Sequence, residues 1–195
     1  MTSLWNSSSI VPWATALERY DHVVSRQEVT RLAELDRWYR DDLPVAIEAR
    51  TRPHVTLPEL VRLAEWKMAR GVWRAPNLVL VRSNPADEVI ETSTRALAMV
   101  PHLTAPIAAL AGLKGVGPAT ASAVTASAAP AIYPFFDELV AEQVPSLGKV
   151  AWTLGFYGRY AAALRARAVA LGSDWTPVMV ERALWSWVGG KKGAR

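Results

Sequence analysis

The sequence predicts an all-α fold, and three observations support this. Helix-capping patterns are repeatedly followed by apolar residues at helical spacing. The one segment with strand-like composition, Pro76 to Val81, has no second strand with which it could pair. Hydrophobic residues make up 51% of the 195 residues, which is enough to bury the core of one medium domain.

Capping boxes predict two helices in the first third of the chain. The box Ser25 to Glu28 precedes apolar residues at near-helical spacing, and Asp42 to Pro44 is expected to end that helix. The box Thr56 to Glu59 opens a second helix, Leu57 to Arg70, which Gly71 is placed to stop. We interpret Pro76 to Val81 as a buried turn or short helix.

Caps, prolines and glycines predict six more helices. Asn84-Pro85 is read as a cap followed by proline at the first helical position, and Thr176 as the cap of the last helix. Gly189-Gly190 is expected to stop that last helix. The six segments are Pro85 to Val100, Thr104 to Ala111, Pro118 to Ala128, Asp137 to Gln143, Gly158 to Leu171 and Pro177 to Val188.

The chain is expected to fold as one helical domain over residues 1–195, with two small lobes around a cleft as a variant of that arrangement. It divides into N-terminal helices (1–80), a hairpin-containing part (84–145), C-terminal helices (146–190) and a basic tail (191–195). The tail is polar and is expected to be mobile.

Composition excludes several classes of site. There are no cysteines, so a disulfide framework, a thiolate zinc site and a cysteine-ligated cluster are excluded. His22, His54 and His102 do not stand at ligand spacing, so we expect no metal bound by side chains. The net charge of +4 and the pI near 9.6 favour a polyanionic partner.

No apolar run approaches the ~20 residues that span a bilayer, so no membrane partner is expected. The segment Met1 to Pro12 lacks a basic region followed by an apolar core, and no secretion signal is expected there. An intracellular protein is the resulting expectation, with a monomer as the default.

The segment between two alanine-rich helices carries the strongest functional signal. Gly115-Val116-Gly117 predicts a tight turn without side-chain bulk, in which Val116 enters the seam between the helices. The next helix begins at Pro118, so its unsatisfied N–H groups point toward the same side. With Lys114 beside it, such a corner is suited to holding a DNA phosphate. The alternative is an ordinary helix–helix turn that uses glycine.

The longer pattern, Leu113-x-Gly115-Val116-Gly117-x-x-Thr120-Ala121, resembles the hairpin of the helix-hairpin-helix base-excision DNA glycosylase superfamily. The resemblance covers about residues 110–145 and implies a glycosylase-like helical domain that binds duplex DNA. It assigns DNA contacts to the hairpin residues Lys114, Gly115, Val116, Gly117, Ala119 and Thr120. It also implies a K⁺ or Na⁺ ion on backbone carbonyls near Leu113 and Gly115, with no other cofactor.

The same resemblance places a catalytic aspartate at Asp137, 18 residues beyond Ala119. Leu80 to Asn84 is similar to the segment that fills the gap left by a flipped base, which gives Asn84 the role of the plug. Bifunctional members carry a lysine where this chain has Ala119, so a lyase step from that position is excluded. Only 30 residues separate Asn84 from Gly115, fewer than in typical relatives.

Asp137 has a chemical rationale of its own. Cleavage of an N-glycosidic bond develops positive charge on the sugar, which an ionised carboxylate stabilises, and a helix N-terminus favours the anion. The alternative is that Asp137 only caps its helix. Glu138 and Glu142 are possible substitutes, although a solvated helix face explains them better.

A flipped base is held between aromatic planes. The aromatic residues that could border the cleft are Trp66, Trp73, Tyr133, Phe136 and Trp152, each with the alternative of a core position. Arg70 and Arg74 are candidates for phosphate contacts. Lys67 is a candidate nucleophilic amine, although a half-buried lysine that reaches out to water is the favoured interpretation.

Three functions remain open at this point. The leading hypothesis is a DNA repair protein that acts as a monofunctional glycosylase and removes a damaged base from duplex DNA. The second is a non-catalytic helix-hairpin-helix module that binds damaged or distorted DNA, and the short spacing after Asn84 favours it. The third is a helical protein whose hairpin contacts a protein partner.

Overall fold

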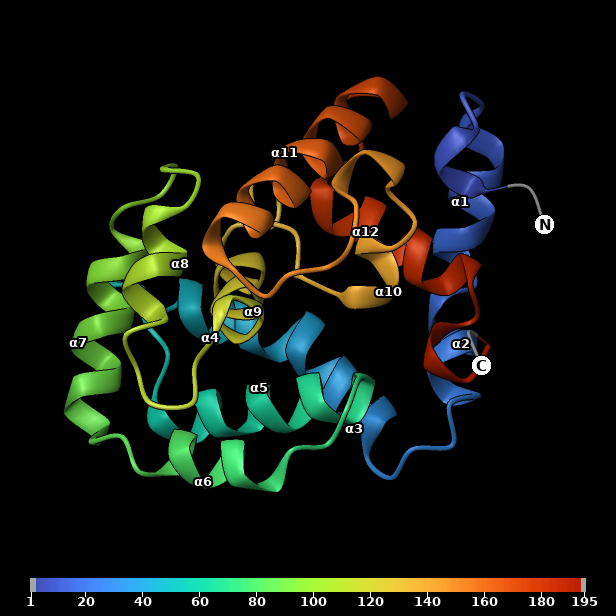
Figure 1. Ribbon diagram of the computed structural model, residues 1–195. Helices are drawn as coiled ribbons and strands as arrows, with labels where there is room; N and C mark the ends of the chain where they lie inside the picture. Colours follow the sequence, from blue (N-terminus) through green and yellow to red (C-terminus); the bar gives the residue numbers. More distant parts are fainter. Residues whose placement is uncertain (1–2, 194–195) are drawn as a thin grey trace.

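The computed structural model describes residues 3–193, and within this range every regular element is a helix (Figure 1). The predicted all-α class is confirmed. The buried apolar side chains form one continuous core that runs from Leu4 to Trp185. No helix in residues 3–193 is long and apolar enough to cross a bilayer.

The N-terminal helices differ from their prediction. A short 3₁₀ turn, η1 (Leu4–Asn6), precedes α1 (Ile10–Glu18) and α2 (Tyr20–Ser25). Ser25 ends α2 instead of capping a helix, and its hydroxyl donates to the His22 carbonyl. The next helix begins only after Arg31, which has a φ of 65°.

The predicted stop at Asp42 to Pro44 is also wrong. α3 (Leu32–Arg37) continues through a π-helical segment, η2 (Trp38–Asp42), into α4 (Leu43–Glu48). Pro44 falls in the first turn of α4, directly after the π-helical segment, in which Leu43 N–H donates to the Trp38 carbonyl.

The middle of the chain follows its predicted helices, but the prediction of Asn84 as a cap is wrong, because Pro85 is the N-cap of α7 and no side chain caps that helix. α5 (Leu57–Arg70) begins at the predicted capping box, in which Glu59 N–H donates to Thr56 Oγ1 and Thr56 N–H donates to Glu59. The interpretation of residues 76–81 as a short helix is confirmed. The next four helices are α6 (Ala75–Arg82), α7 (Ala86–Leu97), α8 (Ala105–Leu110) and α9 (Pro118–Ala128).

The C-terminal third holds the remaining helices. α10 (Glu138–Ala141) is a single turn capped by Asp137, and η3 (Pro145–Leu147) follows it. α11 (Leu154–Leu171) begins four residues before the predicted start, because the Thr153 side chain caps it. α12 (Pro177–Trp187) begins at the predicted cap, Thr176.

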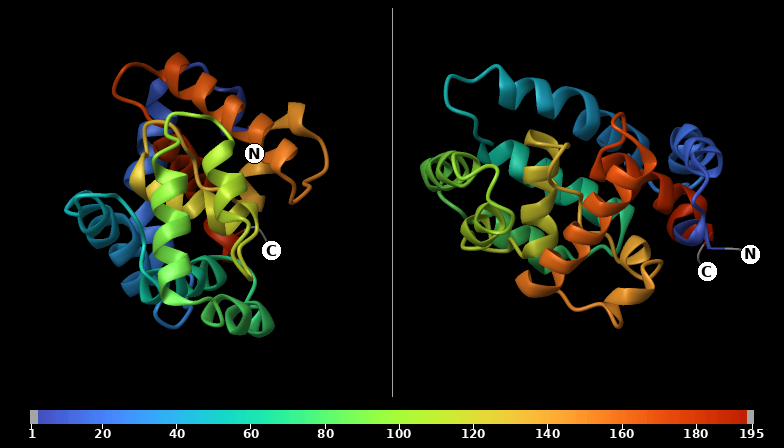
Figure 2. Two further views of the ribbon diagram at one scale, coloured as in Figure 1. Left: turned by 90° about the vertical axis from the view of Figure 1, so that its left-hand side faces the viewer. Right: turned by 90° about the horizontal axis from the view of Figure 1, so that it is seen from above.

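α9 lies inside the molecule, with α4, α5 and α8 packed around it (Figure 2). Its residues from Ala119 to Ser127 are all buried. They are small, so neighbouring helices approach closely, and the Tyr39 hydroxyl reaches the Ala123 carbonyl at 2.9 Å. α9 therefore holds the hairpin at its N-terminus against a rigid interior.

A second group of helices is centred on α12, which packs against α1, α2, α10 and α11. The basic tail begins beside this group, because Gly190–Gly193 forms a short helix, α13, that contacts α12. Lys191 Nζ also donates to the Gly71 carbonyl at the end of α5. The mobility of the tail stays a prediction. Residues 194 and 195 lie outside the described residues.

Candidate functional site

The hairpin between α8 and α9 is closed by a hydrogen bond from Val116 N–H to the Leu113 carbonyl, at 3.1 Å. Both of these side chains are buried in the core. Val116 therefore enters the seam between the helices as predicted. This corrects the prediction of Val116 as a DNA contact, because its amide is already bonded and its side chain is covered.

The two glycines of the hairpin have different roles. Gly115 has a φ of 73°, and a Cβ there would lie 2.8 Å from the Asn77 carbonyl oxygen and 2.9 Å from Val81 N. Gly117 has a φ of −95°, is exposed, and has no atom within 4 Å of an added Cβ. The left-handed conformation is therefore found only at Gly115. Gly117 leaves open space on the outer side of the turn.

Two asparagines hold the hairpin from the side of α6. Asn77 Nδ2 donates to the Gly115 carbonyl at 3.0 Å. Asn84 Oδ1 accepts from Lys114 N–H, and Asn84 Nδ2 donates to the Lys114 carbonyl, both at 2.9 Å. Asn84 is 3% exposed. This corrects the prediction of Asn84 as the plug, because its amide group is buried and bound to backbone.

Four backbone amides of the hairpin corner have no hydrogen bond to another group within residues 3–193. They belong to Gly115, Gly117, Ala119 and Thr120. The last two are in the first turn of α9, where the helix has no acceptor for them. The corner therefore presents N–H donors at the positive end of a helix, as the sequence predicted.

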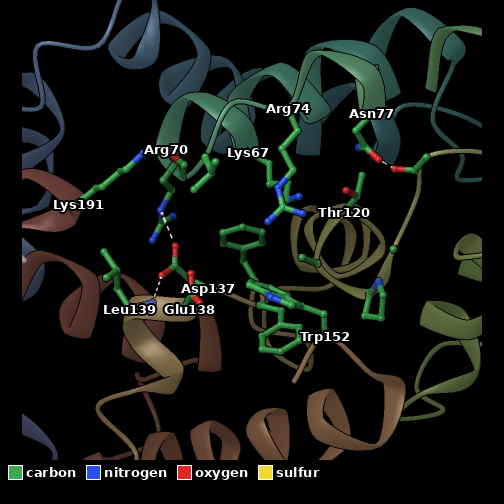
Figure 3. Close-up of a pocket in the computed structure, with 18 residues that line it drawn as sticks. Lys67, Arg70, Arg74, Asn77, Thr120, Asp137, Glu138, Leu139, Trp152 and Lys191 are labelled. Atoms are coloured by element: carbon green, nitrogen blue, oxygen red, sulfur yellow. Dashed lines mark hydrogen bonds and ion pairs between the residues drawn. The ribbon is translucent and has the colours of Figure 1, made fainter. Parts of the chain in front are cut away.

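A pocket of about 360 Å³ lies between this corner and the start of α10 (Figure 3). Lys67 and Arg74 enter it from α5 and the start of α6, and Asp137 and Glu138 enter it from the other side. The other lining residues are Arg70, Gly71, Val72, Asn77, Gly115, Gly117, Pro118, Ala119, Thr120, Phe135, Phe136, Leu139, Trp152 and Lys191.

Asp137 is 8% exposed and caps α10, where its Oδ1 accepts from Leu139 N–H at 2.9 Å and from Val140 N–H at 3.4 Å. Its Oδ2 lies 3.4 Å from Arg70 Nε. Burial raises the pKa of Asp137, and the charge of Arg70 and the two amides oppose this only in part. The expected stabilisation of the anion by the helix terminus is present but is outweighed.

Arg70 is not available for a phosphate. Its side chain is 2% exposed, and it binds Glu181 and contacts Asp137 in the protein interior. Burial lowers the pKa of Arg70, but the charges of Glu181, Tyr20, Asp137 and Asp36 together outweigh this, and the pKa is raised. This corrects the prediction of Arg70 as a DNA contact, because a guanidinium paired with two carboxylates is held inward.

Within residues 3–193, three cations that line the pocket have no carboxylate partner: Lys67, Arg74 and Lys191, whose Nζ donates to the Gly71 carbonyl. Arg74 is exposed, whereas Lys67 is half-buried. Burial, followed by the nearby charge of Arg74, lowers the pKa of Lys67. Lys114 is exposed but does not line the pocket.

Two of the five aromatic candidates border the pocket. Phe136 and Trp152 line it with ring centroids 4.8 Å apart, and Trp152 is 45% exposed. Phe135 also lines the pocket, and no feature of the sequence distinguishes it from a core residue.

The other three aromatic predictions are corrected. Trp66 is fully buried, stacks on Tyr39 at 3.7 Å and donates its Nε1–H to Asp36. Tyr133 is buried, and its hydroxyl donates to the His102 carbonyl. Trp73 is exposed but borders a separate surface hollow next to α3.

Two lining residues carried no clear sequence signal. Asn77 follows a proline in a segment of ambiguous structure, and Lys191 lies in the expected tail. Glu138, which was considered as a substitute acid, does line the pocket, whereas Glu142 lies exposed at the end of α10. Asn77 and Lys191 reach the site through the tertiary fold, which their positions in the sequence do not reveal.

The carbonyls assigned to a monovalent cation already take part in the hairpin. The Leu113 oxygen accepts from Val116 N–H, and the Gly115 oxygen accepts from Asn77 Nδ2. Each carbonyl oxygen keeps one further lone pair, so the pair still fits a weakly bound cation. The K⁺ or Na⁺ ion stays a prediction.

Comparison of the chain with protein-family models, with curated proteins and with solved structures found no match.

Proposed function

We propose that this chain binds duplex DNA at the hairpin and removes a damaged base by hydrolysis of its N-glycosidic bond. The observation that carries the proposal is that the hairpin and Asp137 line one pocket. A flipped nucleotide requires donor amides for its phosphate outside the pocket and a carboxylate near its sugar inside. The two sides of this pocket carry these groups.

The chemistry assigned to Asp137 follows from its surroundings. As the bond from C1′ to the base breaks, its electron pair leaves with the base and positive charge develops on the sugar. The carboxylate stabilises this charge and accepts a proton from the water whose oxygen bonds to C1′. The raised pKa of Asp137 makes it a stronger proton acceptor than an exposed aspartate.

The departing base would lie against the aromatic side of the pocket. Trp152 and Phe136 offer ring faces there, and Arg74 and Lys67 supply positive charge near the mouth. The volume of about 360 Å³ is within the usual range of small-molecule sites. Ala119 has no amine, so the proposal does not include a lyase step from the hairpin.

The test uses duplexes that each carry one alkylated, oxidised, deaminated or abasic nucleotide, followed by alkali to cleave abasic sites. We expect at least one lesion to give strand cleavage after alkali. Asp137→Asn should reduce release at least about a hundredfold while affinity for the same duplex stays within about twofold. Equal release by this variant would remove Asp137 from the mechanism.

The second candidate function is a non-catalytic module that binds distorted DNA. The burial of Asp137 and its contact with Arg70 favour this alternative, because both restrict access to the carboxylate. Tight, salt-sensitive binding to damaged duplexes with no release of any base would support the module. Lack of DNA binding by the folded protein would exclude both candidates.

A further inference from the structure

A buried cluster of three charged side chains stands behind the pocket. Arg70, from the last turn of α5, lies between Asp137 at the start of α10 and Glu181 in α12. The side chains of Arg70 and Glu181 are each 2% exposed, and that of Asp137 is 10% exposed. One guanidinium therefore serves two carboxylates that water barely reaches.

Arg70 is shared unequally. Its Nη2 donates to Glu181 Oε1, and its Nη1 donates to the Tyr20 hydroxyl at 3.2 Å. Its Nε lies 3.4 Å from Asp137 Oδ2 but makes no hydrogen bond within residues 3–193. Asp137 thus receives the charge of Arg70 while its Oδ2 is not tied by a hydrogen bond.

Within residues 3–193, no cation other than Arg70 forms an ion pair with Asp137 or Glu181. Asp36 is paired with Arg40 at 2.8 Å, and the Tyr20 hydroxyl donates to Asp36. The other titratable groups that face the cluster are Tyr20 (α2), Asp36 (α3), Tyr39 (η2), Tyr160 (α11) and Arg182 (α12), with Lys67, Glu138 and Lys191 on the pocket side.

We infer that Glu181 is a positioning residue for Asp137, and that it acts through Arg70, which the two carboxylates share. By binding Nη2, Glu181 orients the guanidinium so that Arg70 attracts Asp137 without occupying its Oδ2. The assignment of a catalytic purpose rests on the proposed function. The coupling between the two acids does not, because it follows from the shared cation.

The titration of the two acids supports this arrangement. Burial raises the pKa of Glu181 to about 7, against the opposing charge of Arg70, and the charge of Asp137 adds to the rise. Burial also raises the pKa of Asp137. Two acids that share one cation titrate as a pair, so protonation of Glu181 leaves more of the charge of Arg70 to Asp137.

The test measures the carboxyl carbon of Asp137 by ¹³C NMR as a function of pH, in protein labelled at aspartate and assigned with Asp137→Asn. Glu181→Gln keeps an oxygen for Arg70 Nη2 but removes the competing charge. Because the pKa of Glu181 is about 7, its charge acts on Asp137 only above that pH. We therefore expect the wild-type signal of Asp137 to show an inflection near pH 7 that is lost in Glu181→Gln. The same pH dependence of that signal in both folded proteins would overturn the inference.

Glu142→Gln is the matched control. It removes one carboxylate from the end of α10 without touching Arg70, and it should keep the inflection of the Asp137 signal near pH 7. If Glu181→Gln does not fold, the wild-type titration decides. The signal of Asp137 should then show a second inflection at the pH where labelled Glu181 titrates, and a single, independent step would contradict the coupling.

The same variant separates this inference from the proposed function. If base release occurs, the change in rate near pH 7 that accompanies ionisation of Glu181 should be absent in Glu181→Gln, an effect that a merely structural role would not cause. If no base is released by any variant, the glycosylase proposal fails. The NMR result then still decides whether Glu181 and Asp137 are coupled.

Discussion

Asn84 binds the backbone of Lys114 in both directions, with its Oδ1 accepting from the amide and its Nδ2 donating to the carbonyl, each at 2.9 Å. The same Nδ2 also donates to the Val81 carbonyl at 2.8 Å. One buried side chain therefore ties the end of α6 to the hairpin. This relationship fixes the position of the amides that we propose contact DNA.

Asn84→Ala should lower the free energy of unfolding by about 1–3 kcal/mol, because it leaves buried backbone groups without partners. Urea denaturation with an unchanged m-value is the measurement. Ser83→Ala, at the neighbouring exposed position, should cost much less. Wild-type stability combined with weakened DNA binding would instead restore the plug role of Asn84.

The prediction for Asn84 illustrates what the sequence could and could not reveal. Its pairing with Pro85 was a sound indication of a helix start nearby, and α7 does begin at Ala86. The direction of the side chain depends on where the hairpin, 30 residues later, packs against α6. That contact is long-range, and no local pattern encodes it.

The two hairpin glycines should respond in opposite ways to substitution. Gly115→Ala forces a Cβ into the Asn77 carbonyl at a positive φ, so we expect a loss of about 2–4 kcal/mol of stability. Gly117→Val has room for its Cβ and should change stability by less than about 1 kcal/mol. Thermal or urea unfolding of the two variants provides the comparison.

DNA binding by Gly117→Val tests the proposed contact itself. The branched side chain would cover the exposed amides, and affinity should fall about tenfold for all duplex sequences alike. Fluorescence anisotropy with several unrelated duplexes measures this. A change confined to one sequence would contradict a contact to phosphate.

The pocket cations should set the salt dependence of DNA binding. Arg74→Gln should reduce the slope of log K against log salt by about 1, since one phosphate contact is lost. Arg19→Gln is the control, because Arg19 is exposed between α1 and α2 and does not line the pocket. Equal slopes for Arg74→Gln and wild type would remove Arg74 from the DNA interface.

Helix boundaries could be predicted from the sequence where the capping contacts are local, but not where tertiary packing sets the boundary. Thr56 and Glu59 satisfy each other within one turn, so the start of α5 could be read from the sequence. Ser25 stands in the same capping-box pattern, but its hydroxyl donates to the His22 carbonyl. The helix that it was expected to cap begins only after Arg31. The pattern is therefore a necessary part of the signal and not a sufficient one.

The candidate site shows the same division between what the local sequence predicts and what tertiary packing determines. Asp137 and the hairpin were placed correctly relative to each other, because a short helix and one loop join them in the chain. The predicted roles of Arg70 and Trp66 are wrong. Both residues share α5 with Lys67, but Arg70 lies on the side of that helix that faces α12, and Trp66 on the side that faces α3. A residue type cannot distinguish a cation that binds phosphate from one that binds a buried carboxylate.

The stability of the protein should fall as pH rises through neutrality, and Glu181 should be a main cause. Its pKa is about 7 in the folded protein against 4.5 for an ordinary glutamate. The folded state therefore holds a proton that the unfolded state has released. The stability that this proton provides is present below about pH 4.5 and is lost as pH passes 7, on the order of 3 kcal/mol in total.

Glu181→Gln cannot lose this proton, so its stability relative to wild type should grow between pH 5 and pH 8. Urea unfolding of both proteins at unit pH steps measures the difference, with Glu142→Gln as the control that should follow wild type. The pKa of Asp137 is also raised, so Asp137 makes its own contribution to the fall in stability with rising pH. That contribution remains in Glu181→Gln. A difference between Glu181→Gln and wild type that stays constant over this range would mean that Glu181 is already ionised at pH 5. Arg70 would then satisfy both acids fully, and Asp137 would have no competitor for its charge.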